Sequence, residues 1–197
     1  MTSTSLLGGS SEVDYLLYNL GTFRNPVALA GSSPSSLPTL LGLHSTTTPV
    51  PSLAATFLIS NFIYAYAILS TRYIKNRYKF DHNSSPREDV AKYGEAMVRE
   101  GKLSAGQLAM VKRWESAHAN AVEGYTFFVA GVLLGLHAGV PTQTLNRLMA
   151  LYSLARIGFG ISYIAIERER KSWLRTLFWW TGNISCITMM VQAGKRL

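Results

Sequence analysis

The sequence has little charge for its length. Only 15% of its 197 residues are Asp, Glu, Lys or Arg, whereas soluble domains average about 25%. It has one cysteine, Cys186, which excludes an intrachain disulfide framework. Acidic residues are scarce, 11 against 19 basic ones, an imbalance that by itself suggests a nucleic-acid binder. However, 48% of the chain is hydrophobic and its mean hydropathy is positive, so extensive disorder is excluded and the placement of the charge decides its meaning.

The first 52 residues lack both long apolar runs and clusters of basic residues. Ser, Thr and Pro are frequent between residues 31 and 52, and Arg24 is the only basic residue before Arg72. This composition is typical of an extended lead-in, and neither a cleaved signal peptide nor a mitochondrial presequence is predicted. We therefore expect a flexible Ser/Thr/Pro-rich segment at 1–52 and a membrane domain at 53–197.

Four apolar runs in the second part are long enough to cross a bilayer, which takes about 20 residues of helix. Because lipid offers no partners to exposed backbone groups, each run is predicted to be a helix. The predicted all-α, four-helix membrane bundle has spans at about Leu53–Tyr73, Trp114–Val140, Leu145–Ile166 and Trp173–Ala193. In the long first connection, helices are expected at Pro86–Met97 and Ser104–Lys112, and Gln107 stands at capping-box spacing from Ser104.

The basic residues predict an orientation. The first and third connections carry fourteen Lys and Arg residues, whereas the opposite side carries four. The positive-inside rule places both charged connections in the cytosol and both termini in the lumen. The net charge of +8 is therefore a topology signal, and nucleic acid is not an expected partner. The endoplasmic reticulum is the expected membrane.

Polar residues recur inside the predicted spans, where they are costly and usually serve a site. At 100° per residue, one face of the second span carries Arg113, Ser116, Asn120, Glu123 and Phe127. One face of the third span carries Ser153, Arg156, Gly160, Tyr163 and Glu167. We expect Glu123 to pair with Arg156, since each offsets the desolvation cost of the other. The surrounding arginines exceed what one carboxylate needs and indicate an anionic ligand.

Other kinds of site are not supported by the sequence. His44, His82 and His137 do not cluster with His118, and no Cys–His spacing suits zinc, so no metal is expected. There is no Ser–His–Asp arrangement and no glycine-rich phosphate loop. Cys186 lies within the fourth span without a basic neighbour in sequence, which disfavours a role as nucleophile.

The start of the second span resembles the signature of a known family. The segment Arg-Trp-Glu-Ser-Ala-His-Ala-Asn-Ala-Val-Glu, residues 113–123, is similar to that of the MAPEG family, membrane-associated proteins in eicosanoid and glutathione metabolism. Two further likenesses are the Arg156-x6-Tyr163 pair of the third span and the polar turn from Arg168 to Arg175. Together these likenesses cover about residues 53–194.

The resemblance implies a four-helix bundle that forms a homotrimer and holds glutathione between subunits near the cytosolic side. It implies that Asn120 and Glu123 meet the peptide backbone and amino group of glutathione, with Arg156 holding the Glu123 region together. The other glutathione contacts that it implies are Arg72, Arg113 and Arg168 for the carboxylates and Tyr163 in the wall of the site. Arg175 would stabilise the thiolate and polarise a lipophilic second substrate that arrives from the bilayer.

Three functions remain open from the sequence. The first is a glutathione-dependent transferase, isomerase or reductase acting on a lipophilic electrophile. The second is a glutathione-independent isomerase or cyclase of a lipophilic metabolite, with Glu123, Tyr163 and His118 as acid–base groups. The third is a non-catalytic scaffold that presents a lipid. The last two are favoured by departures from residues frequent in the family: Ser116, Ala119 and Trp179.

Overall fold

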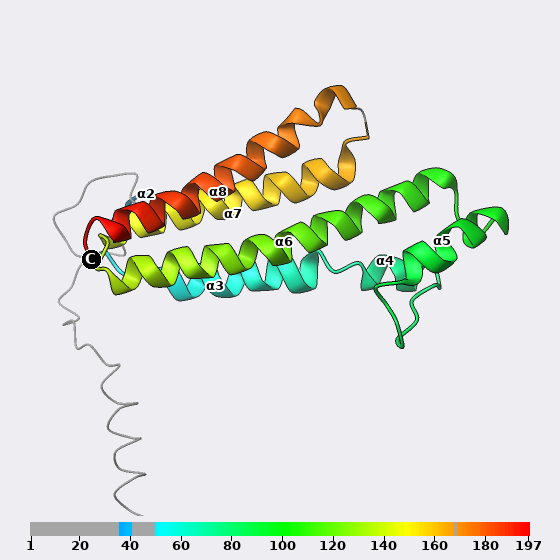
Figure 1. Ribbon diagram of the computed structural model, residues 1–197, viewed down its shortest axis with the longest axis horizontal. Helices are drawn as coiled ribbons and strands as arrows, with labels where there is room; N and C mark the ends of the chain where they lie inside the picture. Colours follow the sequence, from blue (N-terminus) through cyan, green and yellow to red (C-terminus); the bar gives the residue numbers. More distant parts are fainter. Residues whose placement is uncertain (1–35, 41–49, 168) are drawn as a thin grey trace, which may run out of the picture. The chain divides into compact units, whose positions relative to one another are not determined.

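The computed structural model describes residues 36–40, 50–167 and 169–197, which form helices and turns without a strand. The helices are α2 (Leu37–Leu40), α3 (Ala54–Ile63), α4 (Arg72–Arg77), α5 (Asp89–Arg99), α6 (Ala105–His137), α7 (Thr142–Ala165) and α8 (Trp173–Gly194), as shown in Figure 1. A π-helical turn, Tyr64–Ile68, follows α3, and a 3-10 turn, Glu169–Lys171, precedes α8. The predicted all-α class is confirmed for these residues, whereas the division of the chain at residue 52 stays a prediction.

Three stretches of the described chain are long and apolar enough to cross a membrane. They are residues 54–77, 105–137 and 142–165, which correspond to the first three predicted spans. The fourth predicted span coincides with α8, which has 22 residues but is not among these three stretches. Indole and amide side chains such as Trp179, Trp180 and Asn183 lower its hydropathy, so its crossing of the membrane stays a prediction.

The first predicted span, Leu53–Tyr73, is not one regular helix. After α3 the helix widens into the π-helical turn and ends at Leu69. A new helix, α4, begins at Arg72. The Leu69 N–H donates to the Tyr64 carbonyl over 3.0 Å, which closes the π turn. Short π-helical turns inside helices are often found at functional sites. This break creates the opening in which one of the two clefts described below lies.

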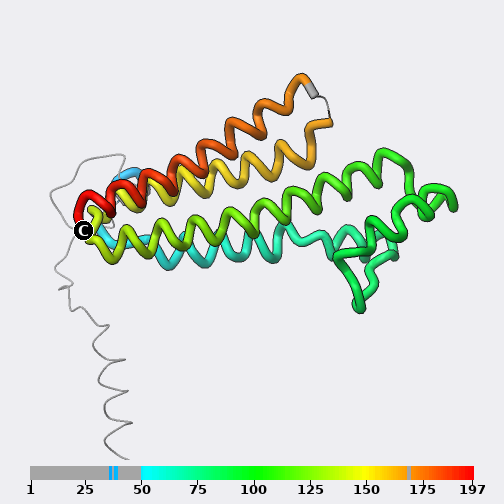
Figure 2. Tube along the Cα trace, in the orientation of Figure 1, coloured from blue at the N-terminus to red at the C-terminus, as the bar shows by residue number. Residues whose placement is uncertain are grey.

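Helix α6 runs unbroken for 33 residues. The helix expected at Ser104–Lys112 is not separate, because it forms the first turns of α6. The predicted capping box is confirmed: the Ser104 hydroxyl accepts from the Gln107 N–H over 3.2 Å, and Gln107 Oε1 accepts from the Ser104 N–H over 2.8 Å. At about 1.5 Å per residue the helix is about 50 Å long, more than a hydrocarbon core of about 30 Å requires. In Figure 2 it continues well past the end of α3 toward α5.

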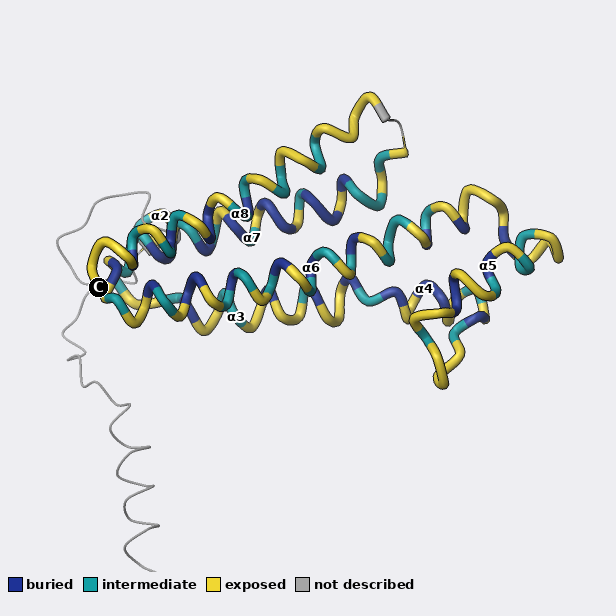
Figure 3. The backbone as a smooth tube through the Cα atoms, in the orientation of Figure 1, coloured by how far each residue is buried: buried dark blue, intermediate teal, exposed yellow. Residues whose placement is uncertain are grey.

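The bundle core lies where α7 and α8 pack against each other and along α6. Phe128 of α6 stacks on Tyr152 of α7 with ring centroids 4.1 Å apart, and both are buried with Met189 and Cys186 of α8. Figure 3 shows the buried positions between the helices and exposed positions along the outer faces. The exposed residues there include apolar ones such as Leu154, as expected for helices that face lipid.

A second core joins the long first connection to the N-terminal half of α6. Its buried side chains are Ile74, Phe80, Val90, Leu103, Leu108 and Val111. Helix α5 begins three residues later than the predicted Pro86–Met97 helix and ends two residues later. Lys75 explains the later start, because its Nζ donates to the Pro86 carbonyl and keeps that residue in the preceding turn.

An ionic cluster lies inside this second core. Lys75 is 2% exposed, and its Nζ lies 3.7 Å from both Asp89 Oδ2 and Glu115 Oε1. The Asp89 carboxylate also accepts from the His82 N–H over 3.0 Å and pairs with His82 Nδ1 over 2.9 Å. Burial raises the pKa of Asp89, but the hydrogen bonds from His82 and the charge of Lys75 outweigh it, so the pKa lies below its ordinary value.

Candidate functional site

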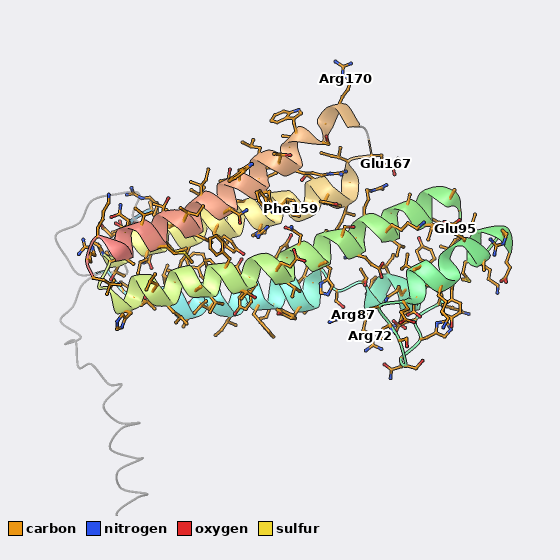
Figure 4. The ribbon with its side chains drawn as sticks, in the orientation of Figure 1. Arg72, Arg87, Glu95, Phe159, Glu167 and Arg170 are labelled. Carbon is orange, nitrogen blue, oxygen red and sulfur yellow. The ribbon has the colours of Figure 1, made fainter. Side chains whose placement is uncertain are left out.

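One cleft opens between α6 and the α7–α8 hairpin. It has a volume of about 440 Å³ and is lined by Asn120, Phe159, Tyr163, Ser172, Arg175, Thr176, Trp179 and Trp180. We call it the α7–α8 cleft. Phe159 projects into the space beside α6 in Figure 4, and it is one of four aromatic residues among the eight that line the cleft.

Arg156 lies beside this cleft in the bundle interior and is 3% exposed. Its Nη1 donates to Asn120 Oδ1 over 2.9 Å, and its Nε donates to the Tyr152 hydroxyl over 3.2 Å. The guanidinium also lies over the rings of Tyr152 and Phe159, at 5.3 and 5.9 Å from their centroids. Among the described residues, no carboxylate forms an ion pair with it. It is therefore a buried cation held by neutral groups alone.

The expected Glu123–Arg156 ion pair is wrong. Glu123 is exposed and makes no ion pair within the described chain, because the Asn120 amide takes its place at the guanidinium. Asn120 and Glu123 are about 60° apart around α6, which is enough to turn one toward α7 and the other away from it.

A glycine makes room for the buried guanidinium. A Cβ atom added at Gly124 would lie 1.4 Å from Arg156 Nη2 and 2.3 Å from its Cζ. The guanidinium therefore rests directly on the backbone of α6, one residue beyond Glu123. Any larger side chain at this position displaces Arg156 from Asn120.

Arg175 is fixed at the C-terminal end of α7. Its Nε donates to the Ser162 carbonyl over 3.4 Å, and its Nη2 donates to the Ile166 carbonyl. The guanidinium lies 4.6 Å from the centroid of the Tyr163 ring. The last carbonyls of a helix lack intrahelical donors and favour a nearby cation. The structure thus brings the predicted residues Tyr163 and Arg175 together in the α7–α8 cleft and orients the arginine without a ligand.

The second cleft lies on the other side of α6, where the first span is broken. It has a volume of about 510 Å³ and is lined by Ser70, Thr71, Arg72, Lys75, Pro86, Arg87, Glu115, His118, Ala119, Val122 and Glu123. We call it the α4–α6 cleft. Arg72 and Arg87 are labelled next to each other beside α4 in Figure 4. Arg72 and Glu123, predicted to share a site with Asn120, therefore lie in a different cleft of the same chain.

Arg113 lines neither cleft. Its Nη2 pairs with Glu167 Oε1 over 2.8 Å, and its Nε donates to the Ile164 carbonyl over 3.2 Å. These contacts connect the N-terminal part of α6, which continues past the end of α3, to the end of α7. Arg168, the remaining predicted carboxylate contact, lies outside the described residues.

Several residues of the α4–α6 cleft were not expected from the sequence. One face of α6 carries Glu115, Ala119 and Val122 together with His118, because these residues are separated by helical spacings of three, four and seven. That spacing is visible in the sequence, but the predicted polar stripe through Asn120 lies on another face of the helix. Lys75 and Arg87 come from the long connection, whose fold the helix periodicity alone does not reveal.

A comparison with models of protein families identifies the family of this chain. The model of the MAPEG family matches residues 50–195, a range that includes both clefts. The chain belongs to the MAPEG family. Neither the curated proteins nor the solved structures contain a match to it. Membership confirms the resemblance of the 113–123 segment and, with the three apolar stretches, makes this MAPEG chain an integral membrane protein. At the level of the family it supports a function in glutathione or eicosanoid metabolism.

Proposed function

We propose that this MAPEG protein is a membrane-embedded enzyme that transfers glutathione to a lipophilic electrophile or uses glutathione to isomerise one. The observation that carries the proposal is the buried, unpaired guanidinium of Arg156 beside Asn120. A buried charge without a counter-charge is costly, and in a membrane bundle it marks a ligand site. Glutathione, with two carboxylates and one ammonium group, offers the missing negative charge.

Arg175 is suited to the thiol of glutathione. A thiol attacks as the thiolate, and a neighbouring guanidinium favours that form. The anchoring of Nε and Nη2 to the end of α7 leaves Nη1 without a hydrogen bond among the described residues. The preset orientation reduces the reorganisation needed when negative charge develops on sulfur.

The aromatic wall of the α7–α8 cleft suits a lipophilic second substrate. Trp179 lines the cleft and meets Trp180 edge-on, with ring centroids 5.0 Å apart. Trp180 is 50% exposed on the outer face of α8, where lipid is expected. These two rings provide a continuous apolar path from the bilayer into the cleft.

The division of the predicted residues between two clefts supports a shared site. Asn120 and Arg175 line one cleft, whereas Arg72 and Glu123 line the other. A glutathione molecule that contacts both sets bridges the α7–α8 cleft of one copy and the α4–α6 cleft of the next. Such a contact is heterologous and closes into a ring when repeated. We therefore propose a homotrimer in the endoplasmic reticulum, with α8 as a fourth span, the charged connections in the cytosol and the termini in the lumen.

The test is calorimetric binding of glutathione to the detergent-purified full chain. We expect the wild-type protein to bind and Glu123→Gln to lose at least about tenfold in affinity, because a charge-assisted contact is worth about 1.5–3 kcal/mol. Glu95→Gln is the matched control, since that carboxylate pairs with Lys112 outside both clefts. A wild-type protein that fails to bind millimolar glutathione rules out the proposal.

A glutathione-independent isomerase or cyclase is the second candidate. It is favoured by the α4–α6 cleft, where Glu115, His118 and Glu123 form an acid–base set within a single chain. Turnover of a lipophilic substrate in the absence of glutathione, by protein that does not bind glutathione, distinguishes this function from the first.

A further inference from the structure

The end of the first span presents carbonyl groups to α6. The π-helical turn Tyr64–Ile68 and the break after it remove these carbonyls from a regular helical ladder. The Ala65 carbonyl accepts from His118 Nδ1 over 2.9 Å, and the Leu69 carbonyl accepts from Trp114 Nε1 over 2.9 Å. Trp114 and His118 are four residues apart, so one face of α6 satisfies both carbonyls.

This contact fixes the protonation pattern of the His118 ring. A carbonyl oxygen has no proton to give, so Nδ1 is the donor and carries the hydrogen. In the neutral ring Nε2 then has a lone pair and accepts protons. No hydrogen bond engages Nε2 within the described residues, and His118 lines the α4–α6 cleft. A histidine with one nitrogen oriented by an acceptor and the other open to a cleft is the arrangement of a general base.

The charges around this ring are largely committed to other partners. Lys75 is neutralised by Asp89 and Glu115, and Arg72 pairs with Asp81 over 3.0 Å. The remaining charged groups of the cleft are Arg87 and Glu123, and Glu123 has no ion pair among the described residues. Its carboxylate is available to balance the positive charge of an imidazolium ion.

We propose that His118 is the general base that removes the thiol proton of glutathione, an inference that rests on the proposed function. The S–H bond breaks, its electron pair stays on sulfur, and the proton moves to Nε2. The thiolate then forms a C–S bond with the electrophile while the leaving group departs with its electron pair, and the imidazolium ion returns the proton to water. In the ring of copies, His118 of one copy acts on glutathione in the α7–α8 cleft of the next. Arg175 stabilises the charge on sulfur but accepts no proton.

The variant His118→Asn separates the base from its structural contact. The Asn amide replaces Nδ1 as donor to the Ala65 carbonyl, but it has no basic nitrogen. With glutathione and 1-chloro-2,4-dinitrobenzene as probes, we expect unchanged glutathione affinity and kcat/KM reduced by about 10²-fold or more at neutral pH. The dependence of kcat/KM on pH should also change in this variant, because the side chain that accepts the proton is gone. Trp114→Phe is the control, since it loses the neighbouring carbonyl contact and keeps the base.

A second measurement needs neither turnover nor a variant. Diethyl pyrocarbonate modifies accessible, unprotonated imidazole nitrogens, and mass spectrometry locates the products. We expect His118 to react in the wild-type protein and glutathione to protect it, while His82, whose side chain is 46% exposed outside both clefts, reacts equally with and without glutathione.

The outcomes separate the two proposals. Retained glutathione binding, with an unprotected His118 or an unaltered pH profile in His118→Asn, overturns the inference and leaves Arg175 as the activating group. Absence of glutathione binding by the wild-type protein overturns the proposed function itself, and the inference with it.

Discussion

Two buried cations in this protein have opposite surroundings. Lys75, in the core of the long first connection, lies within 3.7 Å of two carboxylates, those of Asp89 and Glu115. Arg156, in the bundle interior, has an amide, a hydroxyl and two aromatic rings around it and no carboxylate among the described residues. Both side chains are almost completely buried, so the difference is not one of solvent access.

Under the proposed function, Lys75 serves the fold and Arg156 serves a ligand. The charge of Lys75 is more than balanced inside the protein, and removing it leaves carboxylates without a counter-charge. The charge of Arg156 is unbalanced, and removing it relieves a desolvation cost while leaving only neutral groups unpaired. The two should therefore respond differently to the same substitution.

The largest effect is expected from Lys75→Met, which keeps the side-chain length and removes the charge. Breaking a buried ion pair costs about 3–5 kcal/mol, because the Asp89 carboxylate, whose side chain is 1% exposed, stays buried without this cation. Thermal unfolding of the purified protein, followed by circular dichroism, should show a large decrease in Tm. The control is Lys102→Met at an exposed pair with Glu100, which should leave Tm unchanged. Equal Tm values for the two variants would contradict the role given to Lys75.

A smaller loss of stability is expected from Gly124→Ala, which places a Cβ atom where Arg156 Nη2 lies. Overpacking of this kind costs about 1–3 kcal/mol. Displacement of the guanidinium from Asn120 should weaken glutathione binding further, which calorimetry measures. Gly131→Ala is the matched control on the same helix, since its Cβ atom would meet its nearest neighbours at 3.4 Å. If both variants bind glutathione equally, the Arg156 guanidinium is not part of the site.

Arg156→Met should affect stability still less, by about 1 kcal/mol, because only the hydrogen bonds to Asn120 and Tyr152 are lost. Glutathione affinity should fall by at least about tenfold, the equivalent of about 1.4 kcal/mol. This balance, a small loss of stability with a larger loss of glutathione affinity, is the reverse of that expected for Lys75→Met. A Tm decrease as large as that of Lys75→Met would show that Arg156 supports the fold as much as the site.

The smallest effect is expected from acid, and it appears only at low pH. The pKa of Asp89 is lowered in the folded protein, so its stabilising contribution is complete above the unfolded pKa of about 3.9 and is lost as the pH falls through the folded value. The free energy of unfolding should therefore decrease as the pH falls below about 4. Asp89→Asn should flatten this decrease, as measured by chemical unfolding at several pH values, and an unchanged slope would assign the acid sensitivity to other carboxylates.

The sequence predicted the helices well, because a membrane demands long apolar segments and their ends lie at charged residues. The predicted third span, Leu145–Ile166, and the observed helix, Thr142–Ala165, differ by a few residues. The break in the first span was not predicted, since it depends on contacts with Trp114 and His118 far along the chain. The continuity of α6 was also missed, because its polar first turns are typical of a loop helix.

The site was predicted less completely. Tyr163 and Arg175 come together, as the family resemblance implied, and Asn120 lines the same cleft. The partner of Arg156 was wrong because a helical wheel does not distinguish residues about 60° apart when the tilt of the neighbouring helix is unknown. The separation of Arg72 and Glu123 from Asn120 is likewise a property of helix packing that one sequence does not contain.

The length of α6 has a consequence for where chemistry takes place. About 20 Å of this helix exceeds what a hydrocarbon core requires, and Asn120 and Glu123 lie near the boundary between its polar and apolar parts. Under the proposed function, a water-soluble thiol approaches from one end of the helix and a membrane-dissolved acceptor from the other. The protein then acts as a phase-transfer catalyst, in which one continuous helix joins two solvents that the reactants do not share.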